Sequence, residues 1–146
     1  MGLETVLNIN GSALKAQMLR IEVIGSNIAN INSTRTPEGG PYRRKDVLFQ
    51  TINVGNSFEN EMNSAIDKTA QGVEVTSVVE DPSPFRKKFD PGHPDAGEDG
   101  YVNFPNVNVV AEMVNVQEAA RAYEANVAVI TSIKSMISKT FEIGRR

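Results

Sequence analysis

The chain has 146 residues, of which 40% are hydrophobic and 23% charged, a composition that excludes wholesale disorder. Its 15 basic and 18 acidic residues give a net charge of −3, which disfavours general binding to nucleic acid or to an anionic membrane. The absence of cysteine excludes disulfides and thiolate metal sites.

The N-terminal residues Met-Gly-Leu-Glu lack the basic start and apolar run of a secretory signal. No stretch approaches the roughly 18 uncharged apolar residues that a transmembrane helix needs. We therefore expect no transmembrane segment, and any export should proceed without a cleaved signal peptide.

The first expected element is a helix over residues 5–30. Apolar side chains recur every seven residues from Leu7 to Ile28, which is the spacing of a helix that packs along one face. Gly11 and Gly25 lie beside this row. They indicate either the close approach of a neighbouring helix or a local soft point, because glycine lowers helix propensity. The predicted packing residues of this helix are Leu7, Leu14, Met18, Ile21 and Ile28.

Between residues 42 and 105 the helical pattern gives way to short stretches typical of strands. Proline- and glycine-containing turns separate them. The expected strands are residues 42–54, 72–79, 85–89 and 100–104, and the polar segment 55–71 is expected to be a mobile loop or a short helix. The predicted product is a small antiparallel meander of three or four strands.

Residues 108–141 carry the strongest pattern in the chain. Apolar side chains follow one another at alternating steps of four and three residues, and Lys134 is the one exception. An unbroken run of this kind predicts a long helix with a coiled-coil face. The predicted packing residues of this helix are Val109, Met113, Val116, Ala120, Tyr123, Val127, Ile130, Ile137 and Phe141.

A second apolar row widens the apolar surface of the C-terminal helix. The N-terminal helix can return antiparallel and cover part of this surface, but two helices and a small sheet leave the rest uncovered. Because wide apolar patches mark interaction sites, we expect other subunits to cover the remainder. The second row contains Val110, Val114, Val129, Ile133 and Met136.

The predicted fold class is therefore α+β. Long N- and C-terminal helices pack as a coiled-coil-like pair and bracket a small antiparallel β insert. We divide the chain into the N-terminal helix of a discontinuous helical core (1–34), a β-rich insert (35–106) and the C-terminal helix of the core (107–146).

No group of residues in the sequence supports catalysis. His93 is the only histidine, so a histidine-based metal cluster or a Ser-His-Asp triad has little support. The acidic turn 95–100 matches a calcium loop only in part, because Gly97 stands at its third position and Asn106 at its twelfth. We expect no enzymatic activity, no metal and no cofactor.

Two tracts mix cations with aromatic residues, as single-strand nucleic-acid binders do: Tyr-Arg-Arg-Lys at 42–45 and Phe-Arg-Lys-Lys-Phe at 85–89. The competing interpretation is the solvent-exposed face of strands, where lysines discourage edge pairing. The acidic total favours the second interpretation. We therefore expect no nucleic-acid partner and keep a nucleic-acid-binding module as the alternative function from another class.

Residues at both ends resemble one known family. The stretches 11–17 and 26–33 resemble the N-terminal signature of flagellar rod and hook proteins, and 121–126 resembles their C-terminal signature. The segment 89–107 narrows the resemblance to the flagellar basal-body rod protein family, and within it to subunits of the proximal rod. The residues that match the signatures are Ser26, Asn27, Ala29, Asn30, Pro91, Gly92, Pro94, Gly100, Tyr101, Pro105, Asn106, Tyr123 and Asn126.

The resemblance implies a structural subunit that assembles through its terminal helices. Its partners would be copies of itself, other rod subunits, the basal-body base and the flagellar type III export apparatus. It would be exported unfolded, without a cleaved signal, to the periplasmic rod, which transmits torque and surrounds the export channel. Another rod or hook subunit is the alternative within the same class.

Overall fold

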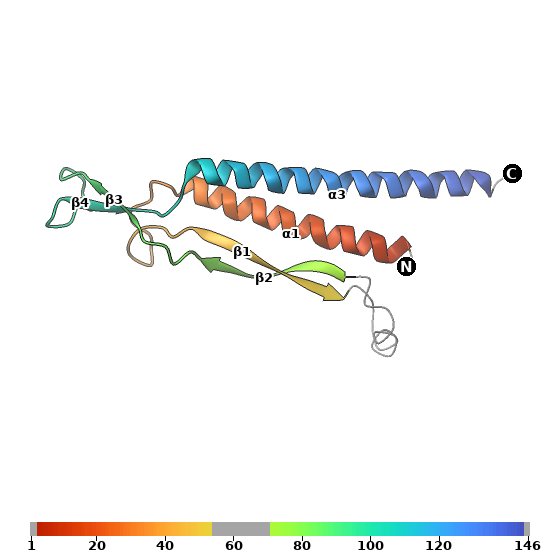
Figure 1. The fold of residues 1–146 in the computed structure, drawn as a ribbon, viewed down its shortest axis with the longest axis horizontal. Coiled ribbons are helices and arrows are strands. Elements are labelled where there is room, and N and C mark those ends of the chain that lie inside the picture. The colour runs from red at the N-terminus through yellow and green to blue at the C-terminus, as the bar shows by residue number, and fades with distance from the viewer. Residues whose placement is uncertain (1–2, 54–70, 145–146) are drawn as a thin grey trace. The chain divides into compact units, whose positions relative to one another are not determined.

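The computed structural model describes residues 3–53 and 71–144 of the chain. These residues form an α+β fold in which two long helices bracket a small β insert, as the sequence predicts (Figure 1). The polar segment expected to be a loop or short helix, residues 55–71, lies outside the described residues except at Gln71.

Helix α1 spans Leu3–Ala29 and helix α3 spans Val109–Ile143, so both predicted helices are confirmed. Helix α1 ends where polar side chains compete for backbone groups. The Asn30 amide donates to the carbonyl of Ser26 at 2.9 Å, and the Ser33 hydroxyl donates to Asn30 Oδ1 at 3.1 Å. No described helix is long and apolar enough to cross a membrane.

Helix α3 begins with an asparagine cap. Asn108 Oδ1 accepts hydrogen bonds from the backbone N–H groups of Val110 at 3.0 Å and Ala111 at 3.4 Å. An asparagine in this position satisfies N–H groups that have no partner inside the helix. The cap therefore sets the residue at which α3 starts.

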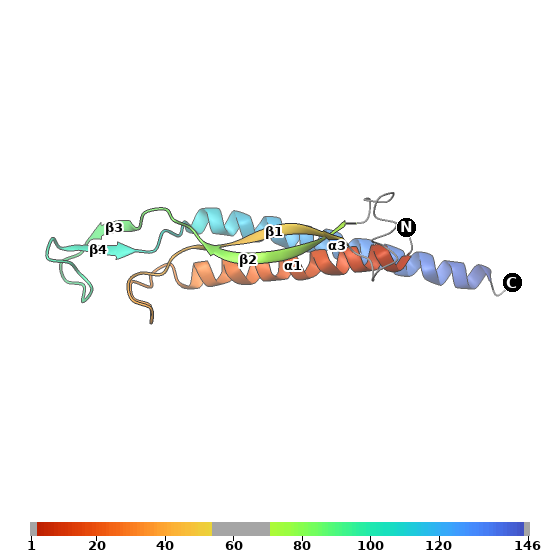
Figure 2. The ribbon, with the colours of Figure 1, turned by 90° about the horizontal axis from the view of Figure 1, so that it is seen from below.

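The described residues of the β insert form four strands, β1 (Lys45–Asn53), β2 (Gln71–Glu80), β3 (Arg86–Phe89) and β4 (Tyr101–Phe104). They form two separate two-stranded sheets, β1–β2 and β3–β4, so the prediction of a single meander is wrong (Figure 2). The break follows β2, where Pro82 and Pro84 have no N–H to continue a ladder. The N–H of Asp81 instead donates to the carbonyl of Arg44 at 2.8 Å.

Strands β3 and β4 are antiparallel, with Phe89 opposite Tyr101. The two rings meet edge to face, with centroids 5.3 Å apart. Gly100, which precedes β4, has a φ of 74°, in the region that favours glycine. The ring of Phe89 covers this glycine so closely that a Cβ there would lie 2.8 Å from Phe89 Cε2.

The chain divides into two compact units by its internal contacts. The first unit contains Met1–Met18, Phe49–Thr76 and Ala119–Arg146, and the second contains Leu19–Leu48 and Ser77–Glu118. In the first unit, the N–H of Val73 in β2 donates to Ser12 Oγ in α1 at 3.1 Å. Among the described residues, the buried apolar side chains are Ala16, Ala119 and Ile133 in the first unit, and Ile24, Tyr42, Val47, Val102, Pro105 and Val107 in the second.

Two glycine substitutions should have opposite effects on stability. Gly100→Ala requires a left-handed φ and a contact with Phe89, so we expect the free energy of unfolding to fall by about 1–3 kcal/mol. At Gly25 in α1, no described atom lies within 4 Å of an added Cβ apart from the adjoining residues and the backbone of the helix itself. There Gly25→Ala should raise the free energy of unfolding by up to about 1 kcal/mol through helix propensity. Urea unfolding followed by circular dichroism measures both, and equal stability of the two variants would contradict the prediction.

Candidate functional site

The side chain of Asn27 is the centre of a buried polar network in the second unit, with 0% of its surface exposed. Its Nδ2 donates to the carbonyl of Lys45 at 2.8 Å and to Glu112 Oε2 at 3.1 Å. Its Oδ1 accepts from the hydroxyl of Tyr42 at 3.0 Å and from the N–H of Lys45 at 2.9 Å. An asparagine amide offers two donor hydrogens and two acceptor positions, and all four are used here. Asn27 thereby joins α1 to the start of β1 and to α3.

Glu112, in the first turn of α3, is the most deeply buried charged residue among those described, at 1% exposure. Its Oε1 accepts a hydrogen bond from Arg44 Nε at 2.7 Å, while its Oε2 accepts from Asn27. Arg44 also lies 3.0 Å from Asp46 and 3.8 Å from Asp81. A buried carboxylate is tolerated only when it is paired and hydrogen-bonded, so Glu112 depends on both of its partners.

Asn106 connects the segment between β4 and α3 to the same network. Its Oδ1 accepts from the N–H of Arg44 at 2.8 Å, and its Nδ2 donates to the carbonyls of Asp81 at 3.2 Å and Ser83 at 3.3 Å. Its neighbour Pro105 is fully buried. We use the name polar network for the side chains of Asn27, Tyr42, Arg44, Asn106 and Glu112.

The network holds Arg44 in its charged form. Burial lowers the pKa of Arg44, but hydrogen bonds to Glu112 and Asp46 raise it by more, so the pKa lies above its ordinary value. Hydrogen bonds from Ser83 lower the pKa of Asp81. Both shifts favour the charged form, so the two side chains keep opposite charges at neutral pH.

The predicted packing row of α1 does not contain the buried residues of that helix. Leu14, Ile21 and Ile28 are half-buried, while Leu7 and Met18 are exposed. Apart from the adjoining residues and the backbone of α1 itself, no described atom comes within 4 Å of a Cβ at Gly11 or Gly25, so no other described element approaches α1 closely there. The buried residues of α1 are Asn10, Ala16, Ile24 and Asn27.

The predicted packing row of α3 lies mostly at its surface. Its buried residues are instead Glu112, Ala119 and Ile133, of which only Ile133 belongs to either predicted apolar row. The half-buried members of the packing row are Val116, Ala120, Ile130 and Ile137, and the exposed ones are Val109, Met113, Tyr123, Val127 and Phe141.

Both units therefore leave apolar side chains of α3 uncovered. Val110 in the second unit is 71% exposed and Phe141 in the first is 72% exposed. The remaining exposed members of the second row are Val114, Val129 and Met136. Exposed apolar patches are characteristic of interaction sites.

Several family-signature residues support the polar network or the turns next to it. Ser26 Oγ lies 3.3 Å from the Tyr42 hydroxyl, and Asn30 ends α1 next to Ala29. Pro91, Gly92 and Pro94 lie in the turn after β3, which the N–H of Asp90 closes by donating to the carbonyl of Gly100 at 3.0 Å.

The two C-terminal signature residues do not join the polar network. Tyr123 and Asn126 both lie in the first unit. Tyr123 is exposed. The Asn126 amide donates back to the carbonyl of Ala122 at 2.8 Å, within its own helix.

The residues weighed for catalysis occupy turns. His93 Nδ1 accepts from the N–H of Asp95 at 3.1 Å, and Asp95 Oδ2 accepts from the Thr34 hydroxyl at 2.8 Å. In the parts of the chain that the structure describes, no three histidine or carboxylate side chains are grouped to hold a metal ion.

Several basic and aromatic side chains of the tracts 42–45 and 85–89 make contacts within the chain. Tyr42 is buried and Arg44 is paired with Glu112. The Arg43 guanidinium lies over the ring of Phe85, 4.3 Å from its centroid. Arg86 lies 5.9 Å from the centroid of Phe104.

The sequence pattern alone does not point to Arg44 or Glu112. A strand with consecutive cations is usually solvent-exposed, and a glutamate in the first turn of a helix usually stabilises the helix dipole. Glu112 directly precedes Met113 of the predicted packing row, but no local pattern shows that Glu112 rather than Met113 turns toward the core.

Two family models match this chain, and both describe flagellar basal body rod proteins. The model of the flagella basal body rod protein matches residues 7–35, and the model of the C-terminal region of flagellar basal body rod FlgEFG proteins matches residues 98–143. Together the matched segments include Asn27, Asn106 and Glu112.

Similarity to individual relatives extends over nearly the whole chain. The flagellar basal-body rod protein FlgC of Borreliella burgdorferi is 44% identical, with 98% of each chain covered. FlgC of Salmonella typhimurium is 42% identical, over 99% of this chain and 100% of the relative. FlgC of Bacillus subtilis is 42% identical, over 95% of this chain and 96% of the relative.

Asn27→Ala should destabilise the chain strongly, because it leaves the Glu112 carboxylate and two backbone groups of Lys45 with fewer partners. We expect the free energy of unfolding to fall by about 2–4 kcal/mol. Asn30→Ala, which removes only local bonds at the end of α1, should cost under about 1 kcal/mol. Urea unfolding of the purified chain compares them, and a similar loss for both would contradict a central role for Asn27.

Proposed function

Because the chain belongs to the FlgC family of flagellar basal-body rod proteins, we propose that it is a structural subunit of the proximal rod. Identity above 40% along nearly the entire chain is the observation that carries this function. The subunit assembles with copies of itself and with other rod proteins into the tubular shaft that transmits torque and surrounds the export channel. Its role is mechanical, and it has no enzymatic activity.

Contacts between subunits form through the exposed apolar side chains of the terminal helices. In the first unit these include Tyr123, Val127 and Phe141, and in the second they include Val109 and Met113. Burying this surface against other subunits releases the water that covers it, which is the main driving force of most protein association. In the same proposal, residues 1–34 and 107–146 form the assembling core and 35–106 the insert.

The subunit reaches the periplasmic rod through the flagellar type III export apparatus. A narrow export route requires an unfolded chain, which must then refold at the growing rod. The absence of cysteine suits this route, because refolding needs no disulfide chemistry.

Val127→Asp should abolish rod assembly and motility while leaving the isolated chain folded. Val127 is exposed in α3, so the new carboxylate is hydrated in the free chain but would be buried without a partner in the contact with a neighbour. Motility in soft agar and the presence of the subunit in purified basal bodies measure the effect. The matched control is Ala128→Asp, at an exposed position about 100° around the helix from Val127 and outside both apolar rows, which should be tolerated better. Normal motility of the Val127→Asp strain would contradict the proposed contact.

Export without cleavage predicts that the assembled subunit keeps its N-terminal segment. Intact-mass analysis of the subunit from purified basal bodies should give the 15.9 kDa of these 146 residues, less at most one methionine. A secretory signal would instead remove about 15–30 residues. A mass lower by that amount would rule out this route.

A further inference from the structure

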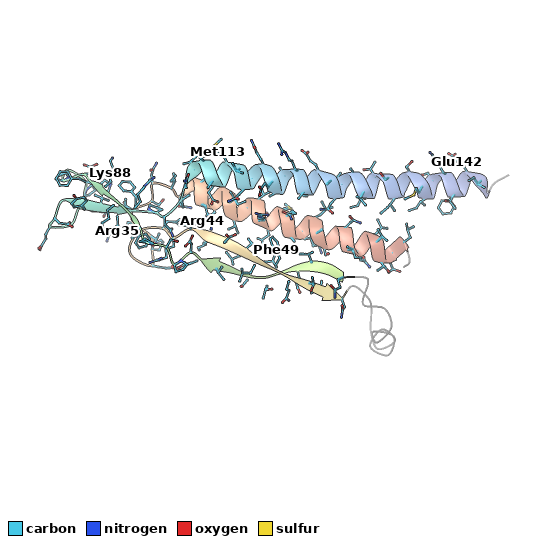
Figure 3. The ribbon with its side chains drawn as sticks, in the orientation of Figure 1. Arg35, Arg44, Phe49, Lys88, Met113 and Glu142 are labelled. Atoms are coloured by element: carbon cyan, nitrogen blue, oxygen red, sulfur yellow. The ribbon has the colours of Figure 1, made fainter. Side chains whose placement is uncertain are left out.

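The first turns of α3 bury a charge and expose apolar side chains, the reverse of what hydrophobic burial alone favours. Glu112 is 1% exposed, whereas Met113 is 57% exposed. Figure 3 shows Met113 on α3 and Arg44 near the start of β1. Val109, Met113 and Val116 share one side of the helix, because they are spaced by four and three residues. Turning α3 about its axis by less than the roughly 100° between successive residues would bring this side toward the core of the second unit.

The polar network prevents this turn. Both oxygens of Glu112 are held, one by Arg44 Nε at 2.7 Å and the other by Asn27 Nδ2 at 3.1 Å. A rotation that buried Met113 would withdraw the carboxylate from both donors. Because a buried donor or charge without a partner is strongly unfavourable, the bonds to Glu112 outweigh the apolar surface that rotation would bury.

We propose that Glu112, held by Asn27 and Arg44, is a positioning residue that sets the rotation of α3 so that its apolar side faces neighbouring subunits. The identity of those neighbours rests on the proposed function. The rotation itself is a property of the single chain and can be measured without assembly. The polar network thereby keeps the apolar side of α3 from being buried in the core of its own chain, so that this side remains exposed for contacts with other subunits.

The test measures the reaction of a maleimide with single cysteines, for which the cysteine-free chain provides a clean background. Met113→Cys and Val114→Cys are each made in the parental chain and together with Glu112→Met. Position 113 would turn inward in the Glu112→Met chain, whereas position 114, now 50% exposed, would remain at the surface. We expect the labelling rate of the Met113→Cys thiol relative to the Val114→Cys thiol to fall about tenfold, because thiol reaction requires access.

Two further results are expected of Glu112→Met without added cysteines. Its melting temperature should fall, because the Asn27 amide and the Arg44 guanidinium each lose a partner. Rod assembly and motility should be lost even where the variant remains folded, since the apolar side of α3 is no longer presented. Glu118→Met, at an exposed glutamate of the same helix, is the control and should leave both the labelling ratio and motility unchanged.

Circular dichroism establishes first that each variant folds. If Glu112→Met does not, the double variant Arg44→Met/Glu112→Met, which leaves no unpaired charge from the pair, is labelled in its place with the same expected tenfold fall. A folded variant that keeps the parental labelling ratio would overturn the positioning role, whether or not motility is lost. A reduced ratio with normal motility would support the positioning role and contradict the use of this surface in assembly.

Discussion

A buried carboxylate is the constraint on which the second unit depends. Glu112 lies in the core with both oxygens hydrogen-bonded, and its partners come from segments far apart in the chain, Asn27 at the end of α1 and Arg44 before β1. Each partner is in turn fixed by others: Asn27 by Lys45 and Tyr42, and Arg44 by Asn106. Because a charge in the core is tolerated only with its full set of partners, this arrangement admits few alternatives. The end of α1, the start of β1 and the start of α3 are specified together.

The same constraint separates the bonds that hold this chain together from the apolar side chains that remain exposed. Polar bonds specify the fold in the second unit, where directional partners discriminate between arrangements that apolar contacts alone would leave close in energy. Apolar side chains of α3, such as Val110 and Met113, are then free for contacts with other molecules. A building block that used its most apolar helix face for its own core would have little left with which to assemble. The separation of internal polar bonds from exposed apolar side chains is consistent with membership of a rod protein family, since a rod consists of repeated contacts between subunits.

The β insert is specified by local contacts and not by a buried charge. Its two sheets are small, and local devices specify the β3–β4 hairpin: Gly100 with its positive φ, the ring of Phe89 over it and the edge contact with Tyr101. Cations that resemble a binding tract in the sequence lie against aromatic rings of the same chain, as Arg43 does on Phe85. In isolation such hairpins are marginal, so these contacts are what gives this one a defined structure.

Sequence periodicity by itself determined the two long helices, the four strands and the excess of apolar surface, because these follow from local spacing and from counting side chains. Asparagine at 30 and 108 and the prolines at 82 and 84 marked ends and breaks for equally local reasons. Which face of α3 turns inward was decided only by the tertiary structure. The apolar row through Met113 is the better candidate by hydrophobicity, and no local rule reveals that Glu112 will meet Asn27 and Arg44, which precede it by 85 and 68 residues. Burial of a charge is a cooperative property of several segments, so it becomes visible only when the chain has folded.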